Sequence, residues 1–169
     1  HQQPQFTLAV IEGAAIAGGM GLACATDAAI AAHDARFALT ETRIGLTPAQ
    51  IAPYVIRRLG YARARYLMLS AAHLNGDDAL AAGLVNELAA DAKDLDKLEN
   101  KLINRVLMCA PGAIAATKAV LAGLEHHEPE EQVMYAAGQF ADCLTGEEAQ
   151  EGISSFLEKR RPIWSPPKS

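Results

Sequence analysis

Two short segments of this chain place residues that could perform chemistry at defined spacings. The first is rich in glycine: Gly18, Gly19 and Gly21 follow Gly13 at a point where a helix is expected to begin. Glycines leave backbone N–H groups unshielded, and the first turn of a helix carries unpaired donors and a partial positive charge. Such donors could hold a developing oxyanion. The glycines could equally serve only a tight turn and close helix–strand packing, and their spacing does not fit the dinucleotide motif G-x-G-x-x-G.

The second segment centres on Glu41, within the mostly apolar stretch from Phe37 to Pro48. A carboxylate buried in such a stretch is costly, and burial favours its protonated form, which would suit Glu41 to shuttle protons near neutral pH. The alternative is a surface glutamate that pairs with Arg43 or Arg36.

Other chemistries find less support in the sequence. Cys24, Cys109 and Cys143 form no C-x-x-C arrangement, so we expect neither a disulfide framework nor a zinc site, and we predict a reducing, cytoplasmic location. His126 and His127 are adjacent and lack the ligand spacing of a helical metal site, so a solvated turn is favoured over metal binding. The net charge of −5 argues against nucleic-acid binding, and we expect no signal peptide and no membrane span.

The elements that must position these residues follow an α/β pattern in the first part of the chain. A strand over 8–11, a glycine turn, a helix over 20–26 and a buried strand over 28–32 form one crossover unit. The following pattern predicts an extended piece over 36–39, a loop over 45–48, helices over 51–59 and 62–69 with Gly60 as a C-cap, and a further helix capped by Asn75.

The rest of the chain reads as almost entirely helical, so we divide it into residues 1–92 and 93–169. Pro111 is expected at the first turn of a helix, where its missing N–H has no cost. Thr145 and Glu148 have the spacing of a capping box before the last helix.

In combination, these motifs resemble the crotonase, or enoyl-CoA hydratase/isomerase, family. The resemblance runs from Leu8 to about Trp164. It rests on the apolar strand over 8–11, the glycine-rich turn over 13–21, Asp27, the F-x-x-x-E segment 37–41, the G-x-x-P loop 45–48, the A-L-A-A-G-L-V run over 79–85 and the segment from Glu151 to Arg160.

The resemblance implies a fold: the second half of a crotonase-like ββα spiral core over 1–92, followed by a helical C-terminal oligomerisation region over 93–169. The family's trimers, or dimers of trimers, imply a homo-oligomer. The family's first half, which supplies the second oxyanion donor, is expected to be absent from this chain.

The resemblance also implies roles for individual residues. Gly18 falls where the family uses a backbone N–H as half of its oxyanion hole, with Gly19 beside it. Glu41 falls on the second of the two glutamates of hydratases, whereas the first would fall at Gly21, which has no carboxylate. The resemblance implies that Gly19 and Gly21 bind the substrate. Two residues of the C-terminal region, Phe140 and Lys159, fall where the family contacts the adenine and phosphate of coenzyme A.

The implied activity is addition of water to an α,β-unsaturated acyl-CoA. The segment from Glu41 to Tyr54 is similar to bacterial hydratases of branched glutaconyl-CoA substrates, which also resemble this chain in having glycine at position 21. A single glutamate also suits a Δ3–Δ2 enoyl-CoA isomerase, and a catalytically silent oligomerisation fragment is the third reading. No cofactor or metal is expected beyond the coenzyme A of the substrate.

Overall fold

The computed structural model describes residues 3–167, which divide into two units. Unit 1 comprises Thr7–Lys101, and unit 2 comprises residues 3–6 together with 102–167. The helix α5 (Ala92–Val106) begins in unit 1 and ends in unit 2.

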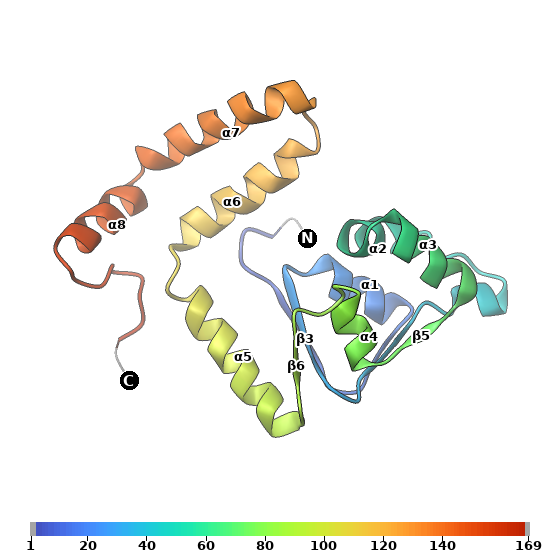
Figure 1. The fold of residues 1–169 in the computed structure, drawn as a ribbon. Coiled ribbons are helices and arrows are strands. Elements are labelled where there is room, and N and C mark those ends of the chain that lie inside the picture. The colour runs from blue at the N-terminus through green and yellow to red at the C-terminus, as the bar shows by residue number, and fades with distance from the viewer. Residues whose placement is uncertain (1–2, 168–169) are drawn as a thin grey trace. The chain divides into compact units, whose positions relative to one another are not determined.

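Unit 1 contains two three-stranded sheets (Figure 1). The first has the order β1-β3-β6 with all strands parallel, and it consists of β1 (Leu8–Ile11), β3 (Ala28–Ala32) and β6 (Glu87–Ala89). The second has the order β2-β4-β5 and consists of β2 (Ala14–Ile16), β4 (Arg36–Ala38) and β5 (His73–Leu74). Here β2 and β4 are parallel, and β4 and β5 are antiparallel.

Twice along the sequence, the chain adds a strand to the first sheet, then a strand to the second sheet, and then forms one or more helices. The first pair of strands, β1 and β2, is followed by α1 (Gly18–Ala25). The second pair, β3 and β4, is followed by the 3₁₀-helix η1 (Glu41–Ile44) and by α2 (Ala52–Leu59) and α3 (Tyr61–Ser70). Helix α4 (Gly76–Ala81) lies between β5 and β6 in the sequence. This repeated β-β-α order confirms the predicted α/β class.

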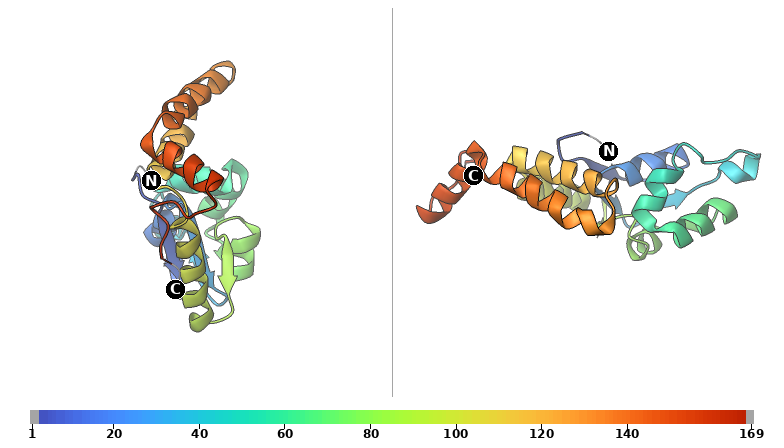
Figure 2. Two further views of the ribbon diagram at one scale, coloured as in Figure 1. Left: turned by 90° about the vertical axis from the view of Figure 1, so that its left-hand side faces the viewer. Right: turned by 90° about the horizontal axis from the view of Figure 1, so that it is seen from above.

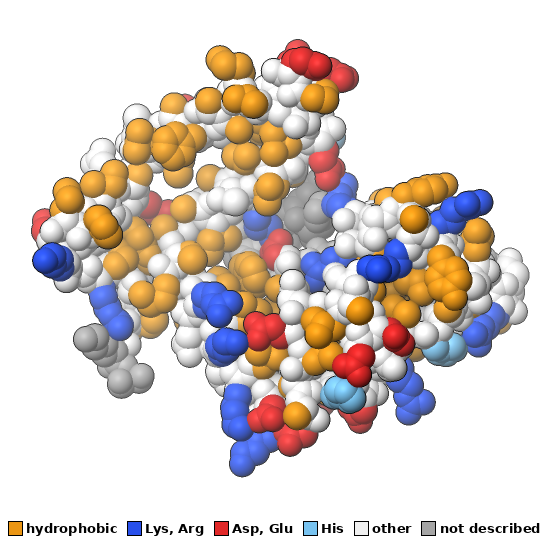
Figure 3. Space-filling view, viewed as in Figure 1, with side chains coloured by type: hydrophobic (Ala, Val, Ile, Leu, Met, Phe, Trp, Pro, Cys, Tyr) orange, Lys and Arg blue, Asp and Glu red, His pale blue; other side chains and the backbone are white. Residues whose placement is uncertain are grey.

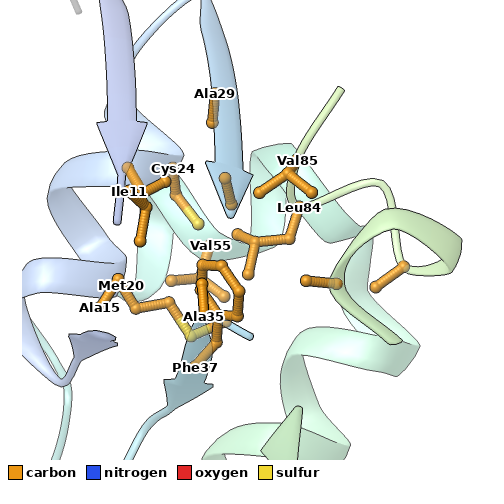
Figure 4. Close-up of a cluster of buried hydrophobic side chains, with 14 of the residues drawn as sticks. Ile11, Ala15, Met20, Cys24, Ala29, Ala35, Phe37, Val55, Leu84 and Val85 are labelled. Atoms are coloured by element: carbon orange, nitrogen blue, oxygen red, sulfur yellow. The ribbon is translucent and has the colours of Figure 1, made fainter. Parts of the chain in front are cut away.

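Small residues dominate the core of unit 1. All five residues of β3, mostly alanine, are buried, as expected of a parallel strand covered on both faces. Figure 4 shows Ile11 and Ala29 of the first sheet and Phe37 of the second converging on Met20 and Cys24 of α1.

Unit 2 is helical. Beyond the end of α5 it contains α6 (Pro111–Leu124), α7 (Pro129–Leu144) and α8 (Glu147–Leu157). Helices α6 and α7 pack side by side (Figures 1 and 2), and His127 in the turn between them stacks on Tyr135 with ring centroids 4.2 Å apart. Many large apolar side chains of α7 and α8 are exposed (Figure 3), among them Val133, Met134, Phe140, Ile153, Phe156 and Leu157.

Several local predictions are confirmed, and others are wrong. The strands over 8–11 and 28–32 have the expected bounds, Gly60 ends α2, and Asn75 caps α4 by accepting a hydrogen bond from the Asp78 N–H at 2.8 Å. The segment over 13–21 is not only a turn, because it contains β2, and β5 and β6 were not predicted. These strands are two or three residues long, which is too short to show a periodicity.

The predicted capping box at the start of α8 is wrong. Gly146 is the N-cap, with no side-chain cap hydrogen bond, and the Thr145 hydroxyl donates to the Asp142 carbonyl at 2.9 Å. The Glu148 carboxylate instead accepts hydrogen bonds from the N–H groups of Gly112 and Ala113, both at 2.9 Å, in the first turn of α6. The carboxylate therefore caps α6 and not its own helix.

No single helix among residues 3–167 has the length and apolar composition needed to cross a bilayer. The consecutive helical segments Lys93–Val106 and Pro111–Leu124, which are bent relative to each other, together have such a length and composition, and this is a statement about length and composition only.

Candidate active site

A strained turn at Ala17 joins β2 to α1. Ala17 has φ 50° and ψ −120°, a combination that residues with a Cβ rarely adopt. Its N–H donates to the Ala38 carbonyl of β4 at 2.8 Å, and its own carbonyl accepts from the N–H groups of Met20 and Gly21. These bonds hold the turn and make Gly18 and Gly19 the first two residues of the helix.

The backbone donors of Gly18 and Gly19 remain available. None of the described hydrogen bonds uses either N–H group, as the geometry of a helix start requires. Both glycines are exposed, and nothing lies within 4 Å of the position that a Cβ would take at either. The two amides therefore border open space at the positive end of α1, which suits an anion.

Glu41 belongs to the same edge of the second sheet. In the parallel pair of β2 and β4, Ile16 lies opposite Ala38, so the chain leaves both strands at one edge. Gly18 follows Ile16 by two residues, and Glu41 follows Ala38 by three and begins η1. The topology thus places Gly18 and Glu41, the two residues for which the resemblance implies catalytic roles, just after neighbouring strand ends at one edge of the second sheet.

One oxygen of Glu41 has an unusual environment. The Oε2 atom is shielded from solvent and has no hydrogen-bond partner, although the residue as a whole is half-buried. A buried polar atom without a partner costs free energy, and in native proteins such atoms call for an explanation such as a catalytic role. This carboxylate oxygen is therefore a candidate acid/base atom.

The surface ion-pair alternative for Glu41 is not supported. The Arg43 guanidinium donates to the Ala71 carbonyl at 2.8 Å, and the Thr42 hydroxyl donates to the Met68 carbonyl at 3.2 Å. None of the described ion pairs joins Glu41 to Arg43 or to Arg36. The two bonds instead tie η1 to the end of α3 and hold Glu41 in place.

Gly21 packs against Ile51, the residue that precedes α2. A Cβ added at position 21 would lie 2.6 Å from the Ile51 Cβ and even closer to its Cγ2. Real Cβ atoms do not approach so closely, so the Ile51 side chain fills the space that any side chain at position 21 would need. A carboxylate side chain at position 21 would therefore fit only if the Ile51 side chain moved.

The two predicted coenzyme A contacts lie in unit 2. Phe140 is exposed on α7, and Lys159 follows α8 with φ 55°. The neighbouring Arg160 bonds to both Glu151 and Glu158, and its hydrogen bond holds the pKa of Glu151 below its ordinary value. The roles of Phe140 and Lys159 stay predictions.

Residues 3–167 hold no group of three or more His, Cys, Asp and Glu side chains that could bind a metal ion. Of the adjacent histidines, His127 has its Nδ1 2.9 Å from the Gly123 carbonyl and stacks on Tyr135, which is a structural role.

Ala17 and Ile51 were not predicted from the sequence. Ala17 precedes a Gly-Gly pair at a strand-to-helix junction, and recognition of β2 would have pointed to it. Nothing in the local sequence marks Ile51, because its contact with Gly21 depends on the packing of α1 against α2.

Comparisons with known proteins agree on one family. Residues 1–167 match the family model described as enoyl-CoA hydratase/isomerase. The structure is similar to that of Pseudomonas aeruginosa AtuE, with a TM-score of 0.93, 46% identity, and coverage of 98% of this chain and 64% of that chain. An enoyl-CoA hydratase/isomerase from Marinobacter aquaeolei gives a TM-score of 0.92 and 38% identity, over 98% of this chain and 62% of that chain.

Among curated proteins, the short-chain-enoyl-CoA hydratase of Clostridium acetobutylicum is 27% identical over 155 residues, which are 91% of this chain and 59% of that protein. The chain thus spans less than two thirds of the length of these relatives. The expectation that the family's first half is absent is not upheld, because the family model matches from residue 1 onward and not only from Leu8.

Proposed function

Because this chain belongs to the enoyl-CoA hydratase/isomerase family, we propose that it adds water across the double bond of an α,β-unsaturated acyl-CoA. The observation that carries the proposal is the buried, unpartnered Oε2 of Glu41 at the sheet edge where the free amides of Gly18 and Gly19 begin α1. An acid/base group and an oxyanion donor are the two components that such a reaction needs.

In the proposed mechanism, the Gly18 N–H donates to the thioester carbonyl oxygen. Glu41 removes a proton from water as the water oxygen bonds to the β-carbon, and negative charge moves onto the thioester oxygen as an enolate. The carboxyl group then returns its proton to the α-carbon, so that the elements of water are added and Glu41 regains its charge. A positioned acid/base contributes roughly 10²–10⁴ in rate, and an oxyanion donor about 10²–10³.

The finer proposal for the substrate is a branched glutaconyl-type acyl group. Its support is the similarity of the segment from Glu41 to Tyr54 to hydratases of such substrates, together with glycine at position 21. We place the adenine and phosphate of coenzyme A at Phe140 and Lys159, and we propose a trimer or a dimer of trimers. The exposed apolar side chains of α7 and α8 support an oligomer. The cytoplasmic location stays a prediction.

The second candidate is a Δ3–Δ2 enoyl-CoA isomerase, in which Glu41 alone moves a proton between two carbons. The observation that favours it is the Gly21–Ile51 contact, which leaves no room for a carboxylate at position 21. Product mass separates the two activities: hydration adds one water, whereas isomerisation leaves the mass unchanged. A catalytically silent fragment predicts no binding of acyl-CoA by calorimetry.

The test is Glu41→Gln in the intact protein, because glutamine keeps the size of the side chain and cannot accept the proton. We expect an unchanged circular dichroism spectrum and a fall in the hydration rate of roughly 10²–10⁴-fold. Glu12→Gln, at an exposed position of unit 1, is the matched control and should keep the rate. Full turnover by Glu41→Gln would end the proposal.

A further inference from the structure

The space beside one face of α1 is open at the first residue of the helix and filled one turn later. Residues three apart on a helix are neighbours on one face, so Gly18 and Gly21 share a face of α1. At Gly18 the position of a Cβ is open, with nothing within 4 Å. At Gly21 the corresponding position is filled by the Ile51 side chain.

Ile51 is firmly placed. It is the N-cap residue of α2, its N–H donates to the Pro48 carbonyl at 3.2 Å, and its half-buried side chain packs against the core cluster of unit 1. Its carbonyl accepts from the N–H groups of Tyr54 and Val55 in the first turn of α2, both at 3.1 Å. The Ile51 backbone is therefore fixed at the start of α2, and its half-buried side chain lies between Gly21 of α1 and the core of unit 1.

Building on the proposed function, we propose that Ile51 is a specificity-determining residue that forms the hydrocarbon wall of the acyl site next to the Gly18 amide. An acyl group whose thioester oxygen is held at Gly18 presents the carbons next to its thioester to the adjoining turn of α1. The wall gives those carbons an apolar contact and limits how bulky a branch they can carry. The substrates that fit are enoyl-CoA thioesters with a small alkyl branch on that side.

The test compares kcat/KM for two enoyl-CoA thioesters that differ only at C3, one with a methyl branch and one with an isobutyl branch. We expect the wild-type protein to prefer the methyl substrate. Ile51→Ala should shift the ratio toward the isobutyl substrate by about tenfold or more, since a single methylene in a hydrophobic pocket discriminates by about 10–200-fold. Ile51→Val should shift it in the same direction by less. Ile56→Ala, which truncates an exposed isoleucine of the same helix, should leave the ratio unchanged.

A second measurement needs no activity. Gly21→Ala should lower the midpoint of urea unfolding in the wild-type background. The drop should be clearly smaller in the Ile51→Ala background, because the truncated side chain vacates the space. An equal drop in both backgrounds would show that Ile51 does not occupy the space beside Gly21 and would overturn the inference.

The outcomes separate this inference from the proposed function. If the wild-type protein and Ile56→Ala hydrate enoyl-CoA but the substrate ratio does not change in Ile51→Ala, the inference is wrong and the proposed function stands. If the wild-type protein adds water to no enoyl-CoA, the proposed function fails and this inference fails with it.

Discussion

Ala17 carries local strain directly before the amide that the proposed mechanism uses. Its φ of 50° and ψ of −120° are costly for a residue with a Cβ, by about 1–3 kcal/mol, and such residues cluster at functional sites. Three backbone hydrogen bonds at Ala17 hold the turn, one to β4 and two within the start of α1. We interpret the strain as the cost of the sharp turn that ends β2 and begins α1 at Gly18.

A β-branched side chain at position 17 should make this strain larger. We expect Ala17→Val to lower the free energy of unfolding by about 1–3 kcal/mol, since a branched Cβ is least tolerated at positive φ. Ala17→Gly should be accepted without such a loss. Ala14→Val, at an exposed position of the preceding strand β2, is the control and should stay within about 0.5 kcal/mol. Urea unfolding measures all three variants, and equal losses at 14 and 17 would contradict the interpretation.

At the scale of elements, side chains bind the backbone at the ends of helices and strands, some from nearby and some from distant parts of the sequence. Glu148 of α8 caps the first turn of α6, and Asn75 and Asp78 cap α4 reciprocally. In unit 1, the Asp27 carboxylate after α1 accepts hydrogen bonds from the N–H and hydroxyl of Thr7, at 2.7 and 2.8 Å, just before β1. These contacts connect consecutive elements to the sheets and helices they pack against.

The cap formed by Glu148 should be measurable. Glu148→Ala leaves two N–H groups of α6 without their acceptor, and we expect a loss of about 0.5–2 kcal/mol in the free energy of unfolding. Glu147→Ala is the matched control, because Glu147 lies in the same first turn of α8, is exposed and makes none of the described hydrogen bonds. A loss in Glu147→Ala as large as in Glu148→Ala would assign the effect to the dipole of α8 instead of the cap of α6.

For the whole molecule, the buried thiol of Cys24 links stability to pH. Burial raises its pKa from 9.0 to about 11, and the nearby Arg58 opposes that rise. The thiol is therefore neutral in the folded protein near neutral pH, and it is no candidate nucleophile. Because the folded pKa lies above the unfolded one, the stabilising contribution is fully present below about pH 9 and is lost as the pH rises toward 11.

The expected result concerns the difference in unfolding free energy between the wild-type protein and Cys24→Ala. That difference should fall as the pH rises from 9 to 11, because only the wild-type chain must keep a thiol protonated to stay folded. Urea unfolding at several pH values measures it. Cys109→Ala, which removes an exposed thiol, should show no such trend. A constant difference for Cys24→Ala would show that the thiol titrates alike in both states.

The sequence by itself determined the features that are encoded within a few neighbouring residues. The continuous apolar runs over 8–11 and 28–32, the breaks at Gly60 and Pro111 and the cap at Asn75 all appear where local patterns predict them. Gly18 and Glu41 stood out as candidates from local patterns, namely glycines at a helix start and a carboxylate in an apolar stretch, and the family resemblance supplied their predicted roles.

Only the tertiary structure decided which distant residues meet. The three residues of β2 have no sequence pattern that predicts a strand, and they form one because they pair with β4. Glu148 accepts hydrogen bonds from N–H groups about 35 residues away. The burial of Glu41 Oε2 and the contact of Ile51 with Gly21 likewise arise from packing. The physical reason is that helices, strands and their ends are set by short-range sterics and capping between neighbouring residues. The space around a side chain and the groups it contacts depend on elements that come from distant parts of the sequence.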